Sequence, residues 1–111
     1  MTQHHHLGTF ELAVMLALIR LGDDAYAIPI SNEIEARSGR AVTIASVYST
    51  LGRLEMKGLV SSEMGEPTPE RGGRAKKYFR VTAKGLREIR DTQRILIRLW
   101  HGLRELGGSR A

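Results

Sequence analysis

Side chains able to bind phosphate groups and base edges are concentrated in two neighbouring stretches of this 111-residue chain. The first, residues 43–57, has the period of about 3.6 residues that is typical of a helix, and Gly58 ends it. One face is apolar, and the opposite face is small, hydroxylated, cationic and nearly free of acid. Such a face is suited to duplex DNA, because small residues permit close approach and hydroxyl and guanidinium groups donate hydrogen bonds. The candidate contacts are Ser46, Tyr48, Ser49, Thr50, Arg53 and Lys57.

The second stretch, residues 67–77, is a loop between two extended segments, Leu59–Met64 and Lys77–Thr82. The two segments predict a β-hairpin whose tip is basic. A helix that fits a groove, with a basic hairpin beside it, predicts a winged helix-turn-helix that binds DNA. The candidate contacts of the hairpin are Arg71, Arg74, Lys76 and Lys77.

Each of these assignments has an alternative that needs no DNA. The net charge of +5 also serves solubility, and it is the clustering of charge in the hairpin that favours an anionic partner. Arg53 can pair with Glu33 or Glu55 instead of a base. The ring of Tyr48 can serve core packing alone, or it can be buried while its hydroxyl group donates to a phosphate.

The composition argues against an enzyme, a cofactor and a metal centre. There are no cysteines, which excludes disulfides and thiolate ligands. Three consecutive histidines, His4–His6, whether native or left from a purification tag, do not converge easily on one ion, and His101 is the only other histidine. The sequence has no phosphate-binding glycine loop and no positioned pair of carboxylates. We therefore expect no catalysis, no cofactor and no metal.

The remaining segments predict the helices that position these two stretches. Thr9 is the expected cap of a first helix, Phe10–Leu21. Pro29 suits the first turn of a second helix, since its missing N–H costs nothing there. The fold class is mainly α with a small β-hairpin. The other expected elements are a helix Pro29–Ser38, a short strand Arg40–Val42, and a long helix from Ala83 to about Leu106, capped by Thr82.

Two of these helices have more apolar surface than one small domain can bury. The first is apolar nearly all round, and the last has a second apolar side beyond Thr92. A second subunit is the simplest cover, so residues 1–82 form the DNA-binding part and residues 83–111 a dimerisation helix with a frayed tail. Trp100 either anchors this interface or stacks on a flat aromatic effector. The expected interface residues are Phe10, Val14, Leu18, Leu96, Leu99, Trp100 and Leu103.

The apolar run near the start of the chain does not have the features of a signal peptide. No Lys or Arg precedes it, and Glu11 lies at its beginning. It is also shorter than the roughly 20 residues that span a bilayer. We expect a cytoplasmic protein.

Three segments of the chain match a known pattern. Ser46-Val-Tyr-Ser-Thr-Leu-Gly-Arg-Leu-Glu-Met-Lys-Gly-Leu59 is similar to a recognition helix of the form T-L-Y-P-x-L-x-R-L-E-x-x-G-L. Gly73-Arg-Ala-Lys-Lys-Tyr-Phe-Arg-Val-Thr-Ala-Lys-Gly85 is similar to a wing followed by a strand-to-helix junction, and Tyr26-Ala-Ile28 to a G-Y-x-I motif. In these segments the chain resembles the PadR family of transcriptional regulators, in its short subgroup with one C-terminal helix. The likeness extends from about Leu7 to Leu106.

The resemblance implies a homodimeric repressor with a near-palindromic operator, and some relatives are released by planar aromatic compounds at the dimer interface. The chain departs from the pattern at three positions. Ala45 replaces a glycine, Ser49 replaces a proline, and Ala25 stands where the first glycine of G-Y-x-I would be. Family base contacts are therefore not transferred to Ser49. The alternative is a winged-helix module that binds a protein instead of specific DNA.

Overall fold

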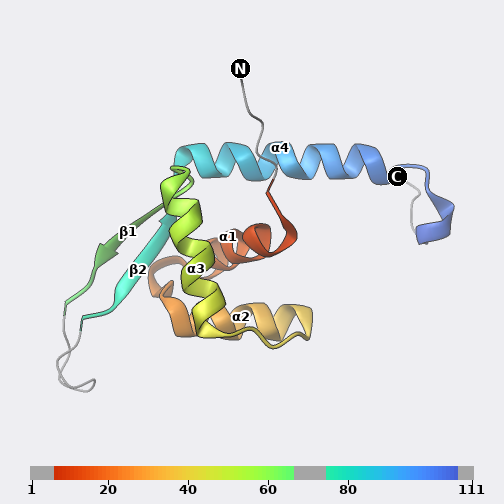
Figure 1. Ribbon diagram of the computed structural model, residues 1–111. Coiled ribbons are helices and arrows are strands. Elements are labelled where there is room, and N and C mark those ends of the chain that lie inside the picture. Colours follow the sequence, from red (N-terminus) through yellow and green to blue (C-terminus); the bar gives the residue numbers. More distant parts are fainter. Residues whose placement is uncertain (1–6, 67–74, 108–111) are drawn as a thin grey trace.

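Four α-helices and one β-hairpin account for most of the chain in the computed structural model, which describes residues 7–66 and 75–107. Helices α1, α2 and α3 pack together beside the hairpin, and α4 runs across them as a separate long rod (Figure 1). The predicted class, mainly α with a small antiparallel sheet, is confirmed. The elements are α1 (Thr9–Leu21), η1 (Gly22–Asp24), α2 (Ala27–Ser38), α3 (Ile44–Met56), β1 (Val60–Met64), β2 (Lys77–Val81), α4 (Ala83–Trp100) and η3 (Arg104–Leu106).

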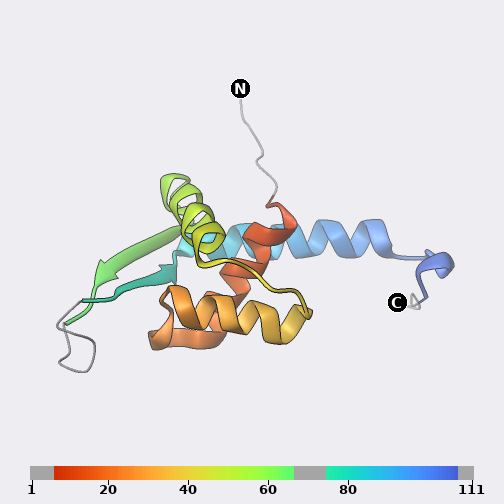
Figure 2. The same cartoon turned by 60° about the horizontal axis from the view of Figure 1, so that its bottom comes forward.

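The core lies between α1, α2, α3 and the base of the hairpin. Figure 2 shows α2 and α3 against α1, with α4 on the side of α1 away from α2. Phe79 of β2 closes the core from the hairpin side, and its backbone N–H donates to Ala25 O at 2.9 Å. The side chains that are fully buried come mainly from the three short helices and include Val14, Met15, Ile30, Val47, Leu51 and Leu54.

The helix starts follow capping chemistry, with one correction to the sequence-based expectation. Thr43 caps α3 by accepting from the Ser46 N–H at 3.0 Å, and Thr82 caps α4 by accepting from the Gly85 N–H at 3.0 Å. The cap of α1 is Gly8 and not Thr9. Glu11 therefore occupies the third helical position, where its Oε1 accepts from the Gly8 N–H at 3.0 Å.

Two further boundaries differ from the expectation. Helix α2 begins at Ala27, so Pro29 falls inside its first turn. Residues 40–42 are irregular and form no strand. The Val42 carbonyl instead accepts a hydrogen bond from Ser31 Oγ at 3.1 Å, which ties this connection to α2 and leaves it unpaired with the sheet.

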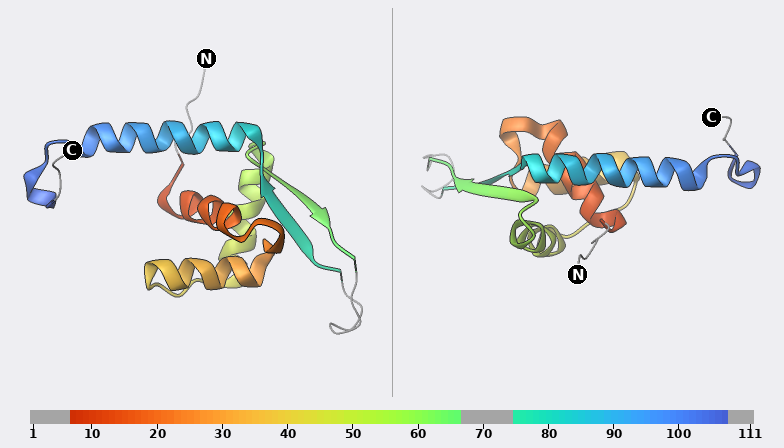
Figure 3. Two further views of the ribbon diagram at one scale, coloured as in Figure 1. Left: turned by 180° about the vertical axis from the view of Figure 1, so that it is seen from behind. Right: turned by 90° about the horizontal axis from the view of Figure 1, so that it is seen from above.

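The hairpin is a two-stranded antiparallel sheet in which Val60 pairs with Val81 and Met64 with Lys77. The pairing continues past the strand ends, because the Gly65 N–H donates to Lys76 O at 2.7 Å. A Cβ on Gly65 would lie 2.6 Å from Tyr78 Cε1, so the absence of a side chain there makes room for the Tyr78 ring. The hairpin projects away from the helices (Figure 3).

The end of α3, the start of β1 and the start of α4 meet at one point, which we call the junction: Lys57, Gly58, Leu59, Thr82 and Lys84. Thr82 donates its N–H to Leu59 O at 3.0 Å and its hydroxyl to Gly58 O at 2.8 Å. Lys84 Nζ donates to Lys57 O at 3.0 Å, next to the C-terminal end of the α3 dipole. The recognition-type helix, the hairpin and α4 are thus tied together by hydrogen bonds.

Helix α4 is shorter than predicted and half of it is uncovered. It ends at Trp100, because Gly102 has a φ of 83° that turns the chain, and a separate short helix follows at Arg104–Leu106. The part up to Thr92 packs on the domain through the buried Gly85 and Thr92, whereas every residue from 93 to 100 is exposed. In the ranges that the structure covers, no helix combines the length and apolar character needed to cross a membrane.

Candidate nucleic-acid interface

The outward face of α3 has the small, acid-free character that the sequence predicts. Tyr48, Ser49, Gly52 and Arg53 are exposed, and Ser46 is half-buried. A Cβ on Gly52 would meet no atom within 4 Å, so this glycine presents bare backbone to solvent. The face is therefore able to lie close against another surface.

Thr50 does not belong to this face, and its predicted exposure is wrong. Only 2% of the residue is exposed. It lies three residues after Val47 and four before Leu54, both fully buried, and residues at those spacings share a side of a helix. Its hydroxyl instead accepts a hydrogen bond from Arg53 Nη2 at 3.1 Å.

Arg53 is held in place by three neighbours. Nη2 donates to Thr50 Oγ1, Nη1 donates to Ser49 Oγ at 3.4 Å, and Nε lies 3.9 Å from Glu11 Oε2. The expected partners are both engaged elsewhere, since Glu33 pairs with Arg37 at 2.9 Å and Glu55 accepts from Ser62 Oγ at 2.6 Å. A guanidinium carries five N–H donors, so donors remain for a further partner.

Lys57 is bound more tightly than Arg53. Its Nζ donates to Glu11 Oε2 at 2.9 Å across 46 residues of sequence, and its side chain is 32% exposed. Burial of Glu11 acts to raise the pKa of its carboxyl. The hydrogen bonds from Lys57 and the Gly8 N–H and the charges of Lys57 and Arg53 outweigh burial, so the pKa of Glu11 lies below its ordinary value. Glu11 was not predicted to take part in this face, because no local pattern links positions so far apart.

On the hairpin, the two predicted lysines that lie in the described range have different surroundings. Lys77 is exposed, with Nζ 5.7 Å from the centroid of the Phe79 ring. Lys76 is half-buried, and its Nζ lies 4.4 Å above the ring of Tyr26, which is packed edge-on against Tyr78 with centroids 5.4 Å apart. Arg71 and Arg74 lie outside the described residues.

Arg80 is a further exposed cation on β2 that the sequence reasoning did not select. It lies one residue beyond the buried Phe79, so the alternation of the strand places it on the opposite face from Phe79, toward solvent. The alternation of the strand is the signal in the sequence that marks Arg80 as exposed.

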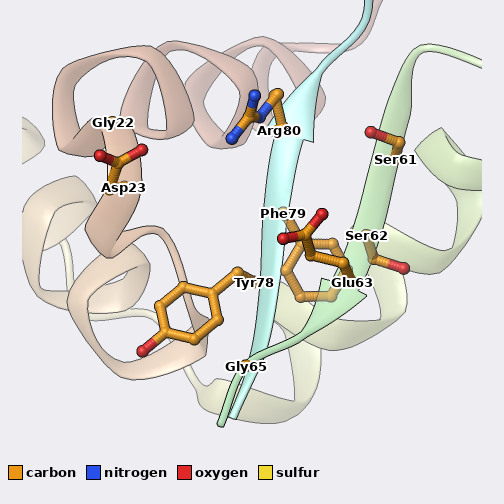
Figure 4. Close-up of a pocket in the computed structure, with 9 residues that line it drawn as sticks. All are labelled: Gly22, Asp23, Ser61, Ser62, Glu63, Gly65, Tyr78, Phe79 and Arg80. Atoms are coloured by element: carbon orange, nitrogen blue, oxygen red, sulfur yellow. The ribbon is translucent and has the colours of Figure 1, made fainter.

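A hollow of about 430 Å³ lies between η1 and the hairpin. Figure 4 shows Asp23 from η1 on one side and Tyr78 and Arg80 from β2 on the other, with Glu63 on β1. Because acid and base both line it, this hollow does not extend the cationic surface of the molecule.

The residues predicted for a dimer interface divide into two groups. Val14 and Leu18 are buried in the core of their own chain, at 0% and 3% exposure, so their assignment to an interface is wrong. On α1 it is Leu16 and Ile19 that are exposed, at 43% and 49%, and Phe10 is half-buried. On and after α4, the exposed members of the predicted set are Leu96, Leu99, Trp100 and Leu103.

The histidines near the start of the chain, His4–His6, fall outside the described residues. Within residues 7–66 and 75–107, no three or more His, Asp or Glu side chains are grouped so as to hold a metal ion.

Comparison with known proteins identifies the family. Residues 15–91 match the model of the transcriptional regulator PadR-like family. A crystal structure of a PadR family transcriptional regulator from Eggerthella lenta is 31% identical, with a TM-score of 0.66, 87% of this chain covered and 86% of the other.

A PadR-like transcription factor from Bacteroides fragilis is 28% identical, with a TM-score of 0.69 and coverages of 83% and 84%. No curated protein matches the sequence. The matched residues include α2, α3, the hairpin and the first half of α4, which together make the geometry described above. The chain belongs to the PadR-like family and is a DNA-binding transcriptional regulator with a winged-helix fold.

Proposed function

We propose that this protein is a homodimeric repressor that acts in the cytoplasm on a near-palindromic operator in duplex DNA. The observation that carries the proposal is the exposed face of α3, which is small, hydroxylated and free of acid, and which lies beside a hairpin that carries lysines. A surface of this kind favours a polyanion over a protein partner.

In the proposed complex, α3 enters the major groove. Arg53 contacts a base edge, because its fork of donors matches the acceptors of guanine. Ser49 donates from the half of the helix nearer its N-terminus, and the exposed hydroxyl of Tyr48 reaches a phosphate. Ser46 donates to Thr43 O at 2.9 Å in the free chain and would have to turn its hydroxyl to reach DNA. We expect Arg53→Ala to weaken operator binding by about 1–3 kcal/mol and to relax sequence preference at one position.

The hairpin holds the backbone or the minor groove through Arg71, Arg74, Lys76 and Lys77. Lys77 is the better-placed of the two described lysines, since Lys76 already lies over the Tyr26 ring. Removal of Lys77 is expected to weaken binding to all duplexes alike and to reduce the magnitude of the slope of log affinity against log salt by about 0.9. A change in the preferred sequence on removing Lys77 would contradict this division between base and backbone contacts.

The dimer is proposed to form through the exposed apolar side chains of α4 and α1. Leu99 and Trp100 are 68% and 54% exposed in the single chain, and Leu16 and Ile19 supply a second strip on α1. Residues 83–111 would thus serve mainly for assembly, and residues 1–82 for DNA. Two copies must hold their α3 helices about 34 Å apart to meet successive half-sites.

Trp100 is proposed to anchor this interface, and a flat aromatic effector stacked on it would change the spacing of the two α3 helices. A panel of planar aromatic compounds should then quench tryptophan fluorescence and lower operator affinity together. If both signals stay constant across the panel, Trp100 is an anchor only.

The first experiment is binding to the DNA upstream of the gene for this protein, compared with scrambled duplex of equal length across a salt series. A preference of about a thousandfold or more at physiological salt is expected for a site-specific regulator. Equal binding that disappears with salt would point to an architectural role. Absence of binding at low salt would favour a protein-interaction module.

A further inference from the structure

Glu11 is the only acidic side chain in the described residues that lies within 4 Å of the cations of α3. It belongs to the first turn of α1 and is 9% exposed. Its Oε2 receives the ammonium group of Lys57 at 2.9 Å and lies 3.9 Å from Nε of Arg53, while its Oε1 accepts from the Gly8 N–H. We call Glu11, Arg53 and Lys57 the α1–α3 charge cluster.

The two cations of the cluster differ in how closely Glu11 binds them. Lys57 has its charge neutralised at hydrogen-bond distance, and its stem is half-buried. Arg53 is touched only at Nε by Glu11, whereas both Nη atoms are steadied from within α3 by Ser49 and Thr50. Arg53 also remains 55% exposed, so its free donors face solvent.

The position of Lys57 along α3 reinforces this difference. Lys57 ends the helix at the junction, where its carbonyl accepts from Lys84 Nζ. Figure 1 shows this end of α3 beside the start of α4, while the other end of α3 lies beside α2. Lys57 therefore links α3 to α1 and α4. Arg53, one turn earlier in the helix, is the cation that remains available to DNA.

We propose that Glu11 is a specificity-determining positioning residue: it withholds Lys57 from phosphate and fixes the side from which Arg53 reaches DNA. This inference rests on the proposed function. It also revises the expectation that Lys57 contacts DNA. The cluster has a net charge of +1, and without the carboxylate it would be +2, with a flexible ammonium able to bind any phosphate within reach.

Loss of the Glu11 carboxylate is expected to raise the affinity for every duplex and to lower the preference for the operator over other sequences. Each additional phosphate neutralised steepens the salt dependence by about 0.9, without regard to sequence. Phosphate contacts carry no direct sequence information, so a freed Lys57 strengthens binding to every duplex. A loosened Arg53 at the same time weakens the one contact that reads a base.

The test is Glu11→Gln, with affinities measured for the upstream duplex and for a scrambled duplex across a salt series. The expected result is tighter binding to scrambled DNA, a salt slope steeper by about 0.9, and a smaller ratio between the two duplexes. Lys57→Met in the wild-type background should leave the slope on scrambled DNA unchanged. The same substitution in the Glu11→Gln background should return the slope to its wild-type value.

Asp91→Asn is the matched control, because it removes one negative charge from an ion pair, with Arg94 at 3.1 Å, that lies on α4 and away from α3. It should change neither the slope nor the ratio. Circular dichroism confirms that each variant is folded, and a destabilised but folded variant still reports a slope, which a merely structural role would not move. The proposal is overturned if Glu11→Gln leaves slope and ratio as in the wild type, or if Lys57→Met alone lowers the slope by about 0.9.

The outcomes also separate this proposal from the one it rests on. A wild-type protein that binds no duplex at low salt would refute the proposed function. A wild-type protein that binds DNA with a slope unaffected by the cluster would refute the role of Glu11 alone.

Discussion

The winged-helix part of the chain and the second half of α4 bury their apolar side chains to very different extents. In the former, Val47, Leu51 and Leu54 of α3 are completely buried by the same chain. In the latter, Ile97, Leu99 and Trp100 are each more than half exposed. The first region has a core of its own, whereas the second presents apolar surface of the kind that marks an interaction site. The comparison shows that the helix proposed to contact DNA belongs to a closed core, whereas the second half of α4 keeps its apolar side chains exposed in the single chain.

The radius of gyration agrees with this contrast. It is 16.1 Å, with a longest extent of 54 Å. A compact chain of this length has a radius of about 13 Å. The excess is consistent with the projecting hairpin and with an α4 that extends past the core (Figure 3).

The largest expected effect on stability comes from a substitution in the core of the winged-helix part. Leu51→Ala should lower the free energy of unfolding by about 2–5 kcal/mol, because it removes buried methyl groups and leaves a cavity. Urea denaturation at constant protein concentration measures it. Met56→Ala, at a residue 90% exposed on the same helix, is the control and should stay within about 0.5 kcal/mol of the wild type.

The next largest effect is expected in the second half of α4, whose exposed apolar side chains are proposed to form the dimer. Leu99→Asp should convert the dimer to monomer in light scattering and reduce operator affinity by about a hundredfold or more, since the two half-sites are then bound independently. Its circular dichroism spectrum should remain helical. Gln93→Asp adds the same charge to an exposed polar position of α4 and should leave the dimer intact. A dimer that survives Leu99→Asp would show that the interface lies elsewhere.

Acidification tests the carboxylate that links α1 to α3. The pKa of Glu11 is lower in the folded protein than its ordinary value of about 4.3, so its stabilisation is fully present above that value and is lost as the pH falls through the folded pKa. As the pH falls below about 6, the wild type should lose more free energy of unfolding than Glu11→Gln, because only the wild type must protonate a carboxylate that is bound to Lys57 and to the Gly8 N–H. If the free energy of unfolding falls equally with pH in the two proteins, Glu11 does not contribute to the acid sensitivity.

The smallest expected effect has the opposite sign. Gly52→Ala should raise the free energy of unfolding by about 0.5–1 kcal/mol, because the added methyl group enters open space and alanine favours helix. The same methyl group projects from the proposed DNA face and should weaken operator binding. Gly85→Ala is the contrasting variant, because its Cβ would clash with the Leu59 carbonyl oxygen, and it should destabilise.

Local signals in the sequence were sufficient for most of the fold. Thr82 caps the helix that it was expected to cap, and Thr43, the first residue of the predicted stretch 43–57, caps α3. Gly58 follows the end of α3 as expected, and Gly39 ends α2, both with positive φ angles. The apolar stripe of α3 identified its buried side, with Val47 at its centre. These features depend on neighbours within one or two helical turns, so a sequence displays them directly.

The errors occurred where tertiary contacts decide. Helix α1 is apolar nearly all round, so its sequence did not show that Val14 and Leu18 face the core while Leu16 and Ile19 face out. Thr50 lies at the edge of a stripe, where a hydroxyl group is compatible with either side until Arg53 takes it as an acceptor. The link from Glu11 to Lys57 spans 46 residues and depends on how α1 packs on α3.

The hydrogen bonds of the junction couple the direction of α4 to that of α3. Hydrogen bonds from Thr82 and Lys84 fasten the start of α4 to the end of α3 and to the first residues of the hairpin, so these parts turn together. With 18 residues, α4 is about 27 Å long, and its part up to Thr92 packs on the domain, so the helix and the domain turn together and a rotation of 10° about the junction displaces the far end of α4 by about 5 Å. In the proposed dimer, a small sliding of two α4 helices past each other would therefore rotate both α3 helices, and the rise between base pairs of DNA is only about 3.4 Å.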